Sequence, residues 1–275
     1  MEVRESKRSL IKKVTIVYTP MKAKAVEMAS ELSKRLSDLG IEGEVLDSER
    51  IMEMGSKIFA DLVITLGGDG TILRSIHSLA DYRTPVLGVN FGRGGYLAEL
   101  DPEEVPEVLD KVLKENFEVE EVIKLSVYAE NRKLGDVVNE VYVSSEYIGK
   151  VIEFEVIRDG CALLEGVADG VIIATPLGST AYAMSAGGPA VDHKLNVVVV
   201  VPVCPLTRMS PLVLPIDSTI TLRLKAPRVH VLIDGQIREI LDKEKLVISK
   251  SEQTVRFVRV KREYSFARRL RKRLR

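Results

Sequence analysis

The sequence predicts two domains, an α/β domain with a parallel sheet and, after it, an all-β domain that forms a sandwich. Up to about residue 117, short apolar runs typical of strands alternate with amphipathic helical patterns. From residue 119 onward the helical spacing disappears, and short alternating segments separated by turn pairs such as Asp159-Gly160 replace it. With 275 residues, the chain is long enough for both domains to bury a core.

The first domain is expected to span residues 1–117. Residues 14–18 alternate as a strand does, and Pro20 ends that strand. Apolar positions over 25–39 then recur every three or four residues, and Gly40 stands where a helix C-terminal cap belongs. Strands that alternate with helices form a doubly wound parallel sheet, so a Rossmann-like domain is expected. Its other strands are predicted at 44–46, 62–66 and 85–89.

The first domain ends with a helix that begins at Asp101 and Pro102 and continues to about Asn116. The sandwich domain is expected over 118–260. Residues 261–275 are expected to form a basic C-terminal helix that packs back on the protein. An apolar stripe of Phe266, Leu270 and Leu274 favours this packing over a nucleic-acid-binding tail. The strands expected in the sandwich are 122–129, 137–144, 151–157, 162–164, 171–174, 197–203, 219–224, 229–233, 246–248 and 254–260.

Composition narrows the possible functions. Forty basic residues balance forty acidic ones, so no global charge favours a nucleic-acid partner. No apolar run is long enough to span a membrane and the first residues lack a signal-peptide core, so we expect a cytoplasmic protein without a membrane partner. Cys161 and Cys204 are expected to be buried thiols, and with three histidines in the chain the sequence indicates no side-chain metal site.

One stretch of the first domain predicts chemistry. An apolar strand over 62–66 leads into Gly67-Gly68-Asp69-Gly70-Thr71, and a helical pattern follows. Glycines permit positive φ and let a ligand approach the backbone, and a helix N-terminus favours a phosphate. Asp69 would repel that phosphate unless it binds a metal or accepts a proton. A plain βα turn is the alternative for this loop.

A second stretch lies inside the β domain. Residues 175–189 are small and mostly polar and join two apolar strands. This connection is longer than loops without a function usually are. Ser179, Thr180 and Ser185 offer hydroxyl groups, and Tyr182 offers an aromatic face. An ordinary surface loop is the alternative.

Together these motifs resemble the NAD kinase family. The resemblance covers nearly the whole chain, in the family's order. It implies an enzyme that phosphorylates the adenosine-ribose 2′-hydroxyl of NAD to give NADP, with Mg²⁺ and with ATP, another nucleoside triphosphate or polyphosphate as donor. It also implies a homodimer or homotetramer with the NAD site near a subunit contact. The motifs that carry the resemblance are Gly67-Gly68-Asp69-Gly70-Thr71, Asn139-Glu140, Asp169-Gly170, Thr175-Pro176, Gly178-Ser179-Thr180-Ala181-Tyr182 and Asp234-Gly235-Gln236.

The resemblance also implies roles for residues. The carboxylate of Asp69 is expected to approach the 2′-hydroxyl as the catalytic base, and Asp169 to lie near the nicotinamide end. A second glycine-rich loop, residues 90–95, follows the strand at 85–89 and is expected to meet the first loop at the carboxyl ends of the strands. Arg74 and Arg93 stand beside these two loops, and a role for either near the donor phosphates is a hypothesis from position alone. The donor is expected at Gly68, Gly70, Thr71 and Arg74, and NAD at Asp69, Gly70, Asn139, Glu140, Asp169, Thr180, Ala181, Tyr182, Ser185 and Gln236.

The sequence departs from the family pattern at Leu177, at Gly94 and Tyr96, and at Leu206, and His193 is assigned no role. Two rival functions stay open at this point. A diacylglycerol-type lipid kinase shares the Gly-Gly-Asp-Gly turn, although the motifs from Asp169 to Ser185 argue against it. A non-catalytic NAD- or NADP-binding regulator would not need the carboxylate of Asp69. The sequence leaves the preferred donor, the use of NADH, feedback regulation and the choice between dimer and tetramer undecided.

Overall fold

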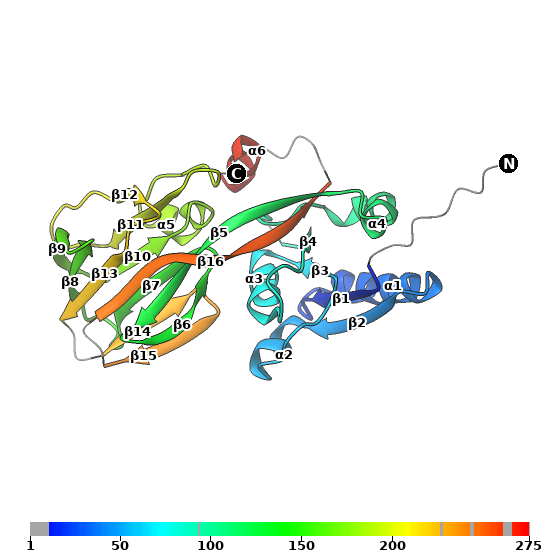
Figure 1. Cartoon of the computed structure of the whole chain (residues 1–275), viewed down its shortest axis with the longest axis horizontal. Coiled ribbons are helices and arrows are strands. Elements are labelled where there is room, and N and C mark those ends of the chain that lie inside the picture. The colour runs from blue at the N-terminus through cyan, green and yellow to red at the C-terminus, as the bar shows by residue number, and fades with distance from the viewer. Residues whose placement is uncertain (1–10, 93, 226–227, 243–244, 261–265, 275) are drawn as a thin grey trace. The chain divides into compact units, whose positions relative to one another are not determined.

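The computed structural model describes residues 11–92, 94–225, 228–242, 245–260 and 266–274 (Figure 1). The chain divides into two compact units. Unit 1 is Met1–Glu121 with Val255–Arg275, and unit 2 is Val122–Thr254. Two long strands, β5 (Glu118–Ala129) and β16 (Lys245–Arg259), contribute residues to both units.

Unit 1 contains a parallel sheet in the order β2-β1-β3-β4, and Phe257 of β16 pairs with Val86 beside β4. The predicted strands and the Gly40 helix end are therefore confirmed, with Gly40 in the left-handed conformation at φ +71°. The elements are β1 (Lys13–Tyr18), α1 (Ala23–Asp38), β2 (Glu42–Asp47), α2 (Ser48–Glu53), β3 (Leu62–Gly67), α3 (Asp69–Ser78), β4 (Val86–Asn90), a 3₁₀ turn (Pro102–Glu104), α4 (Val105–Leu113) and α6 (Phe266–Arg273).

Helices cover both faces of this sheet, as a doubly wound fold requires. The apolar sides of α1 and α4 share one core cluster with residues of β1, β3 and β4. Helix α3 lies on the other face, where a Cβ atom at Gly88 of β4 would come within 2.7 Å of the Ile72 side chain. Helix α4 ends at Leu113, earlier than predicted, because Glu115 turns the chain with φ +56°.

Unit 2 is the predicted sandwich. One sheet contains β16-β13-β8-β9, with β5 paired to β16 and β6 paired to β5, and the other has the order β12-β11-β10-β7-β14-β15. A single apolar cluster contains residues from both sheets. The elements are β6 (Arg132–Val137), β7 (Glu140–Ser145), β8 (Ile152–Arg158), β9 (Cys161–Ala168), β10 (Gly170–Ala174), a 3₁₀ turn (Gly178–Thr180), α5 (Tyr182–Ser185), β11 (Val197–Val203), β12 (Leu212–Pro215), β13 (Ile220–Lys225), β14 (Val229–Ile233) and β15 (Ile237–Leu241).

Two strand predictions are wrong. The segment predicted as one strand over 137–144 is two strands, because the chain leaves the ladder between Val137 and Glu140 to bind Asp234. The segments predicted at 246–248 and 254–260 are parts of one strand, β16. Strands β12 and β15, helices α2 and α5, and all of β6 except Val137 were not predicted.

The C-terminal helix packs on unit 1 as predicted, although a different residue anchors it. Arg269 is 3% exposed, donates to Glu120 at 2.7 Å and lies over the ring of Tyr96. Leu274 of the expected apolar stripe is 68% exposed. The two cysteines are both exposed and free, so their predicted burial is wrong.

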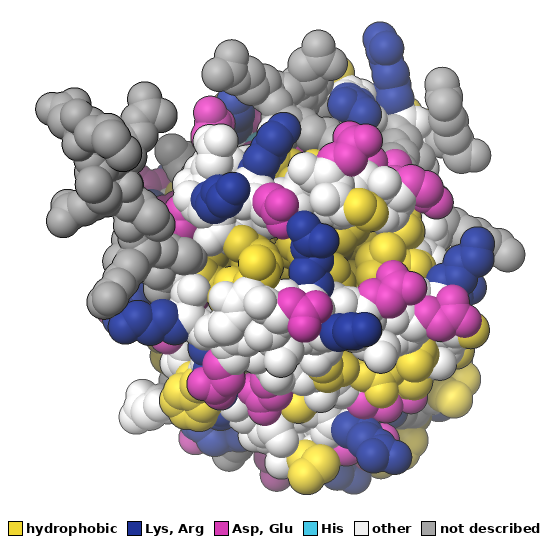
Figure 2. All heavy atoms as spheres, turned by 90° about the vertical axis from the view of Figure 1, so that its right-hand side faces the viewer, with side chains coloured by type: hydrophobic (Ala, Val, Ile, Leu, Met, Phe, Trp, Pro, Cys, Tyr) yellow, Lys and Arg dark blue, Asp and Glu magenta, His cyan; other side chains and the backbone are white. Residues whose placement is uncertain are grey.

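Charges of both signs lie side by side on the face shown in Figure 2, around a hollow lined by hydrophobic side chains. This mixture agrees with the balance of forty basic and forty acidic residues. None of the helices in the described part of the chain combines the length and hydropathy needed to span a bilayer.

Candidate active site

The two glycine-rich loops of unit 1 meet at the carboxyl ends of β3 and β4, as predicted. The N–H of Phe91, just after β4, donates to the carbonyl of Gly67 at 2.9 Å. A Cβ atom at Gly92 would lie 3.3 Å from the Cα atom of Gly68, so the loops touch through bare backbone. This is the edge at which doubly wound sheets bind ligands.

The glycines of the first loop serve different purposes. Gly67 is required by packing, because a Cβ atom there would overlap the side chain of Thr71. Gly68 has φ −94°, and Gly70 is not among the residues with positive φ, so neither uses the positive φ that glycine permits. A Cβ atom at Gly70 would meet nothing within 4 Å, and one at Gly68 would meet only Gly92 at 3.8 Å. The fold of this chain therefore does not require glycine at positions 68 and 70, and the open space lies at the N-terminus of α3.

Asp69 connects the two loops. Its Oδ2 atom accepts a hydrogen bond from the N–H of Tyr96 at 3.1 Å, and its Oδ1 atom accepts one from the N–H of Leu97 at 3.0 Å. The side chain is half-buried. A carboxylate oxygen can accept more than one hydrogen bond, so this carboxylate is fixed in place and can still accept a proton.

The other predicted donor residues lie on α3. Thr71 is buried, and its N–H donates to the carbonyl of Gly68 at 3.0 Å. Arg74 follows one turn later and is half-buried. Arg93 lies outside the described residues.

In unit 2, Asp234 fixes the segment that contains Asn139 and Glu140. Its two oxygens accept the N–H groups of Val138 at 2.8 Å, Asn139 at 2.7 Å and Glu140 at 3.1 Å. Asp234 is 4% exposed and has φ +51°. Gln236 donates from Nε2 to the carbonyl of Asp234 at 3.2 Å.

The loop after β10 packs directly against this segment. The N–H of Thr175 donates to the carbonyl of Asn139 at 2.8 Å, and its hydroxyl donates to the carbonyl of Val138 at 2.6 Å. A Cβ atom at Gly178 would overlap the backbone of Asn139. The motifs at 139–140, 175–180 and 234–236 are thus brought together, although the sequence separates them by up to about a hundred residues.

The side chain of Asn139 presents a buried oxygen atom in this cluster. The Oδ1 atom of Asn139 is buried and accepts no hydrogen bond from the described residues. The hydroxyls of Ser179 and Thr180, in contrast, are used internally, because Ser179 bonds to Val191 and Thr180 donates to the carbonyl of Leu177. The departure at Leu177 places an apolar side chain where it is 1% exposed.

An aromatic surface lies beyond the same loop. Tyr182 is 41% exposed, and its ring meets that of Tyr142 edge to face at a centroid distance of 5.3 Å. Burial, assisted by the neighbouring Tyr182, raises the pKa of Tyr142. Ala181 is half-buried and Ser185 is exposed.

Asp169 is not brought together with Asn139 and Glu140. In the antiparallel pairing of β7 and β10, Ala174 faces Glu140 and Gly170 faces Ser144. At 3.3 Å per residue, Asp169 lies roughly 15 Å along the sheet from Glu140. It lines a separate pocket of about 330 Å³ with residues that include Tyr142, Tyr147 and His230.

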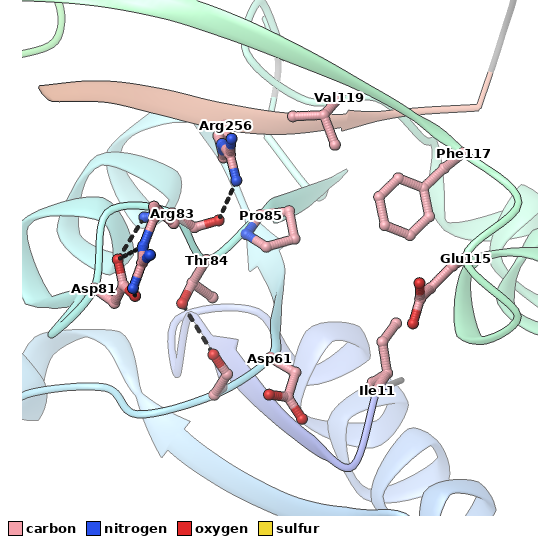
Figure 3. Close-up of a pocket in the computed structure, with 11 residues that line it drawn as sticks. Ile11, Asp61, Asp81, Arg83, Thr84, Pro85, Glu115, Phe117, Val119 and Arg256 are labelled. Atoms are coloured by element: carbon pink, nitrogen blue, oxygen red, sulfur yellow. Dashed lines mark hydrogen bonds and ion pairs between the residues drawn. The ribbon is translucent and has the colours of Figure 1, made fainter. Parts of the chain in front are cut away.

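Unit 1 has another pocket of about 630 Å³ at the opposite edge of its sheet (Figure 3). Ile11, Asp61 and Pro85, which line it, precede β1, β3 and β4, so it lies at the amino ends of the strands. Its two arginines are already paired. Arg83 binds Asp81, and Arg256 donates to the carbonyl of Arg83. The glycine loops, at the carboxyl ends, remain the better ligand site of unit 1.

Among the described residues, no group of three histidine, cysteine, aspartate or glutamate side chains could hold a metal ion. The residues that the sequence analysis did not assign to the site, Asp234 above all, act through the backbone. Asp234-Gly235 has the pattern of a turn pair, and the spacing gives no sign of the three amides that its carboxylate binds.

Comparisons with known proteins identify the family. The model of the ATP-NAD kinase N-terminal domain matches residues 55–117, and that of the C-terminal domain matches residues 138–260, more than half of the chain together. The NAD kinase of Methanothermobacter thermautotrophicus is 39% identical over 254 residues, which cover 88% of this chain and 89% of the relative. The chain belongs to the NAD kinase family. It is therefore a phosphotransferase that acts on NAD, and the lipid kinase and regulator alternatives are not favoured.

Solved NAD kinase structures share the fold. A crystal structure of an NAD kinase from Archaeoglobus fulgidus in complex with ATP has a TM-score of 0.79 and 30% identity, and covers 94% of this chain and 99% of its own. Yeast NADH kinase complexed with NADH has a TM-score of 0.78 at 22% identity, covers 97% of this chain and 91% of its own, and shows the fold alone.

Proposed function

We propose that this NAD kinase uses ATP as donor and that Asp69 is the base for the adenosine-ribose 2′-hydroxyl of NAD. The observation that carries the proposal is the fixed carboxylate of Asp69 beside bare glycine backbone at the N-terminus of α3. ATP as donor is supported by the similar NAD kinase from Archaeoglobus fulgidus, which was solved in complex with ATP.

In the proposed reaction, Asp69 takes the proton of the 2′-hydroxyl as the oxygen attacks the γ-phosphorus. The bond between the γ-phosphorus and the bridging oxygen breaks, and ADP leaves with that electron pair. A carboxylate base is typically worth about 10² to 10⁴ in rate, and positioning and charge neutralisation supply most of the rest.

The donor phosphates are proposed to bind at Gly68, Gly70 and Thr71. The open space at Gly68 and Gly70 admits phosphate oxygens close to the backbone, and the N-terminus of α3 favours their negative charge. Arg74, one turn along the same helix, is proposed to add positive charge near the donor.

Mg²⁺ is proposed as the cation of the reaction. The described residues form no cage for it, which fits an ion that keeps several waters and binds through substrate phosphates. When bound, it neutralises charge on the phosphate oxygens.

The acceptor is proposed to bind on unit 2. The buried Oδ1 atom of Asn139 is suited to accept from a hydroxyl or amino group, and the carboxylate of Glu140 to accept from ribose hydroxyls. The exposed ring of Tyr182 is suited to pack against the adenine, beside Thr180, Ala181 and Ser185. Gln236 supports the site through the turn at Asp234.

Asp169 is proposed to bind the nicotinamide end, and the chain to form a homodimer or homotetramer. The distance of roughly 15 Å along the sheet between Asp169 and Glu140 supports a role for Asp169 away from the adenosine. Light scattering of the purified protein during gel filtration measures the assembly, and a monomer at assay concentration would contradict it.

The decisive experiment incubates purified protein with NAD, Mg²⁺ and either ATP or polyphosphate. An NADP-specific dehydrogenase then reports the product. We expect NADP with ATP. Product with polyphosphate alone would refute ATP as donor, and no product with any donor would refute the enzyme assignment.

A further inference from the structure

A buried charged cluster in unit 2 is not used by the proposed reaction. The side chain of Lys124, on β5, is 1% exposed, and its Nζ atom lies 3.6 Å from Oδ2 of Asp136 and 3.4 Å from Oε1 of Gln253. Asp136, on β6, also accepts hydrogen bonds from Ser126 at 2.6 Å and from Ser251 at 3.2 Å. The cluster therefore joins three strands, β5, β6 and β16.

Stability alone does not explain such a cluster. The free-energy cost of desolvating two charges is about as large as the stabilisation from their attraction. Well-packed apolar side chains at such positions often make a protein equally stable. Burying Lys124 lowers its pKa to about 8, although the charges of Asp136 and Asp234 raise it. The chain thus keeps a cation where burial opposes it.

The position of the cluster indicates its use. Asp136 is in the last two residues of β6, directly before the segment 138–140. Asp234 binds the three backbone N–H groups of that same segment. Two buried carboxylates therefore border the segment that presents Asn139 and Glu140, and Lys124 is attracted to both. Asp136 has two cationic partners among the described residues: Lys133, at 2.7 Å and 42% exposed, and Lys124, at 3.6 Å and 1% exposed. Lys124 is therefore the partner that pairs with this carboxylate inside the fold, where solvent screens the charges least.

We propose that Lys124 is a positioning residue for NAD, because its ammonium group pairs with Asp136, directly before the segment, and so holds residues 138–140 in the geometry that binds the acceptor. The proposal rests on the proposed role of Asn139 and Glu140 in binding NAD. It requires no contact between Lys124 and either substrate.

A pH dependence follows from the charged groups that face Lys124. These are Asp136 and Lys133 from β6 and Asp234 from the turn between β14 and β15. As the pH rises through about 8, Lys124 loses its proton, and its attraction for the neighbouring carboxylate of Asp136 is lost. The KM for NAD should therefore rise at least threefold between pH 7 and pH 9.5, while the KM for ATP stays within twofold.

The test measures both KM values and kcat from pH 6.5 to 9.5 in three variants. Lys124→Arg keeps the charge throughout this range, so its KM for NAD should stay flat. Lys124→Met removes the charge, so its KM should be at least threefold higher than wild type at pH 7 and independent of pH. Lys225→Met, at the exposed surface pair with Glu153, is the matched control and should follow wild type.

The outcomes separate this proposal from the acceptor site itself. The role of Lys124 is overturned if Lys124→Met has the same KM for NAD as wild type at pH 7, or if its KM rises with pH as that of wild type does, while Asn139→Ala still raises the KM. A wild-type KM in Asn139→Ala overturns the acceptor site and this proposal together. If Lys124→Met does not fold, the double variant Lys124→Met/Asp136→Asn removes both buried charges. The KM for NAD of the double variant should be between one and ten times the wild-type value and should not depend on pH. If that KM rises with pH as the wild-type KM does, the proposal is overturned.

Discussion

Replacing Gly70 with alanine should make the protein more stable and less active. Gly70 lies in the first turn of α3, has no positive φ, and has nothing within 4 Å of the place a Cβ atom would take. Alanine is favoured over glycine inside a helix by about 0.5–1 kcal/mol. At about 2–4 °C per kcal/mol for a chain of this size, the melting temperature should rise by roughly 1–4 °C.

The same methyl group would occupy the space proposed for the donor phosphates. A hydrogen bond to a charged group is worth about 1.5–3 kcal/mol. Losing one such bond should lower kcat/KM for ATP by roughly 10- to 100-fold, since each 1.4 kcal/mol is a factor of ten. The KM for NAD should change much less than kcat/KM for ATP, because most of the residues expected to bind the acceptor lie on unit 2.

The assay is a thermal melt of each variant together with steady-state kinetics against ATP and NAD. Gly67→Ala serves as the contrasting control, since its Cβ atom would overlap Thr71 and should lower the melting temperature. A Gly70→Ala protein with a wild-type kcat/KM for ATP would refute the reasoning that this surface is kept bare for the donor.

Three further predictions concern single groups. Asp69→Asn should lower kcat at least about 10²-fold, because the variant lacks the proposed base. It should also lower the free energy of unfolding by about 1–3 kcal/mol, because an amide nitrogen would face the N–H of Tyr96 or Leu97. Saturating kinetics and denaturant melts measure the two effects, and an unchanged kcat would exclude Asp69 as the base. Asn139→Ala should raise the KM for NAD about tenfold with little loss of stability, since its Oδ1 atom has no partner among the described residues; a large stability loss with an unchanged KM would assign it to folding. Lys124, with a pKa of about 8 against 10.5 in the unfolded chain, binds fewer protons when folded. Deprotonation of Lys124 should therefore increase the free energy of unfolding as the pH rises from 8 to 10.5. Denaturant melts across this range should show the increase in wild type and not in Lys124→Met.

The sequence predicted the parts of the fold that local patterns determine. The parallel strands, the helix end at Gly40 and the turn at 67–71 each depend on residues within a few positions. The break between β6 and β7 could not be predicted, because the side chain that causes it is Asp234, more than ninety residues away. Lys124 likewise occupies an ordinary position in an alternating strand, and only the folded chain places Asp136 and Gln253 beside it.

The sequence predicted the residue types of the candidate site better than the use of each residue within the fold. Glycine at positions 68 and 70 was explained by backbone freedom and by the close approach of a ligand. The backbone there is ordinary, and the empty space agrees with the second explanation. The hydroxyls of Ser179 and Thr180 were expected to face a ligand, whereas both bond within the loop. Internal hydrogen bonding of this kind leaves no trace in residue spacing.

Asp69 combines two tasks that one substitution does not separate directly. Its carboxylate holds the N–H groups of Tyr96 and Leu97, and it is also the proposed base. A loss of loop order weakens substrate binding, so saturating substrates and a temperature far below the melting point should restore most of kcat. A missing base lowers kcat under all of these conditions, because no amount of bound substrate supplies a proton acceptor. The ratio of wild-type to Asp69→Asn kcat at saturation, measured at several temperatures, therefore distinguishes the tasks, and a ratio that falls to near one on cooling would leave Asp69 with the structural task alone.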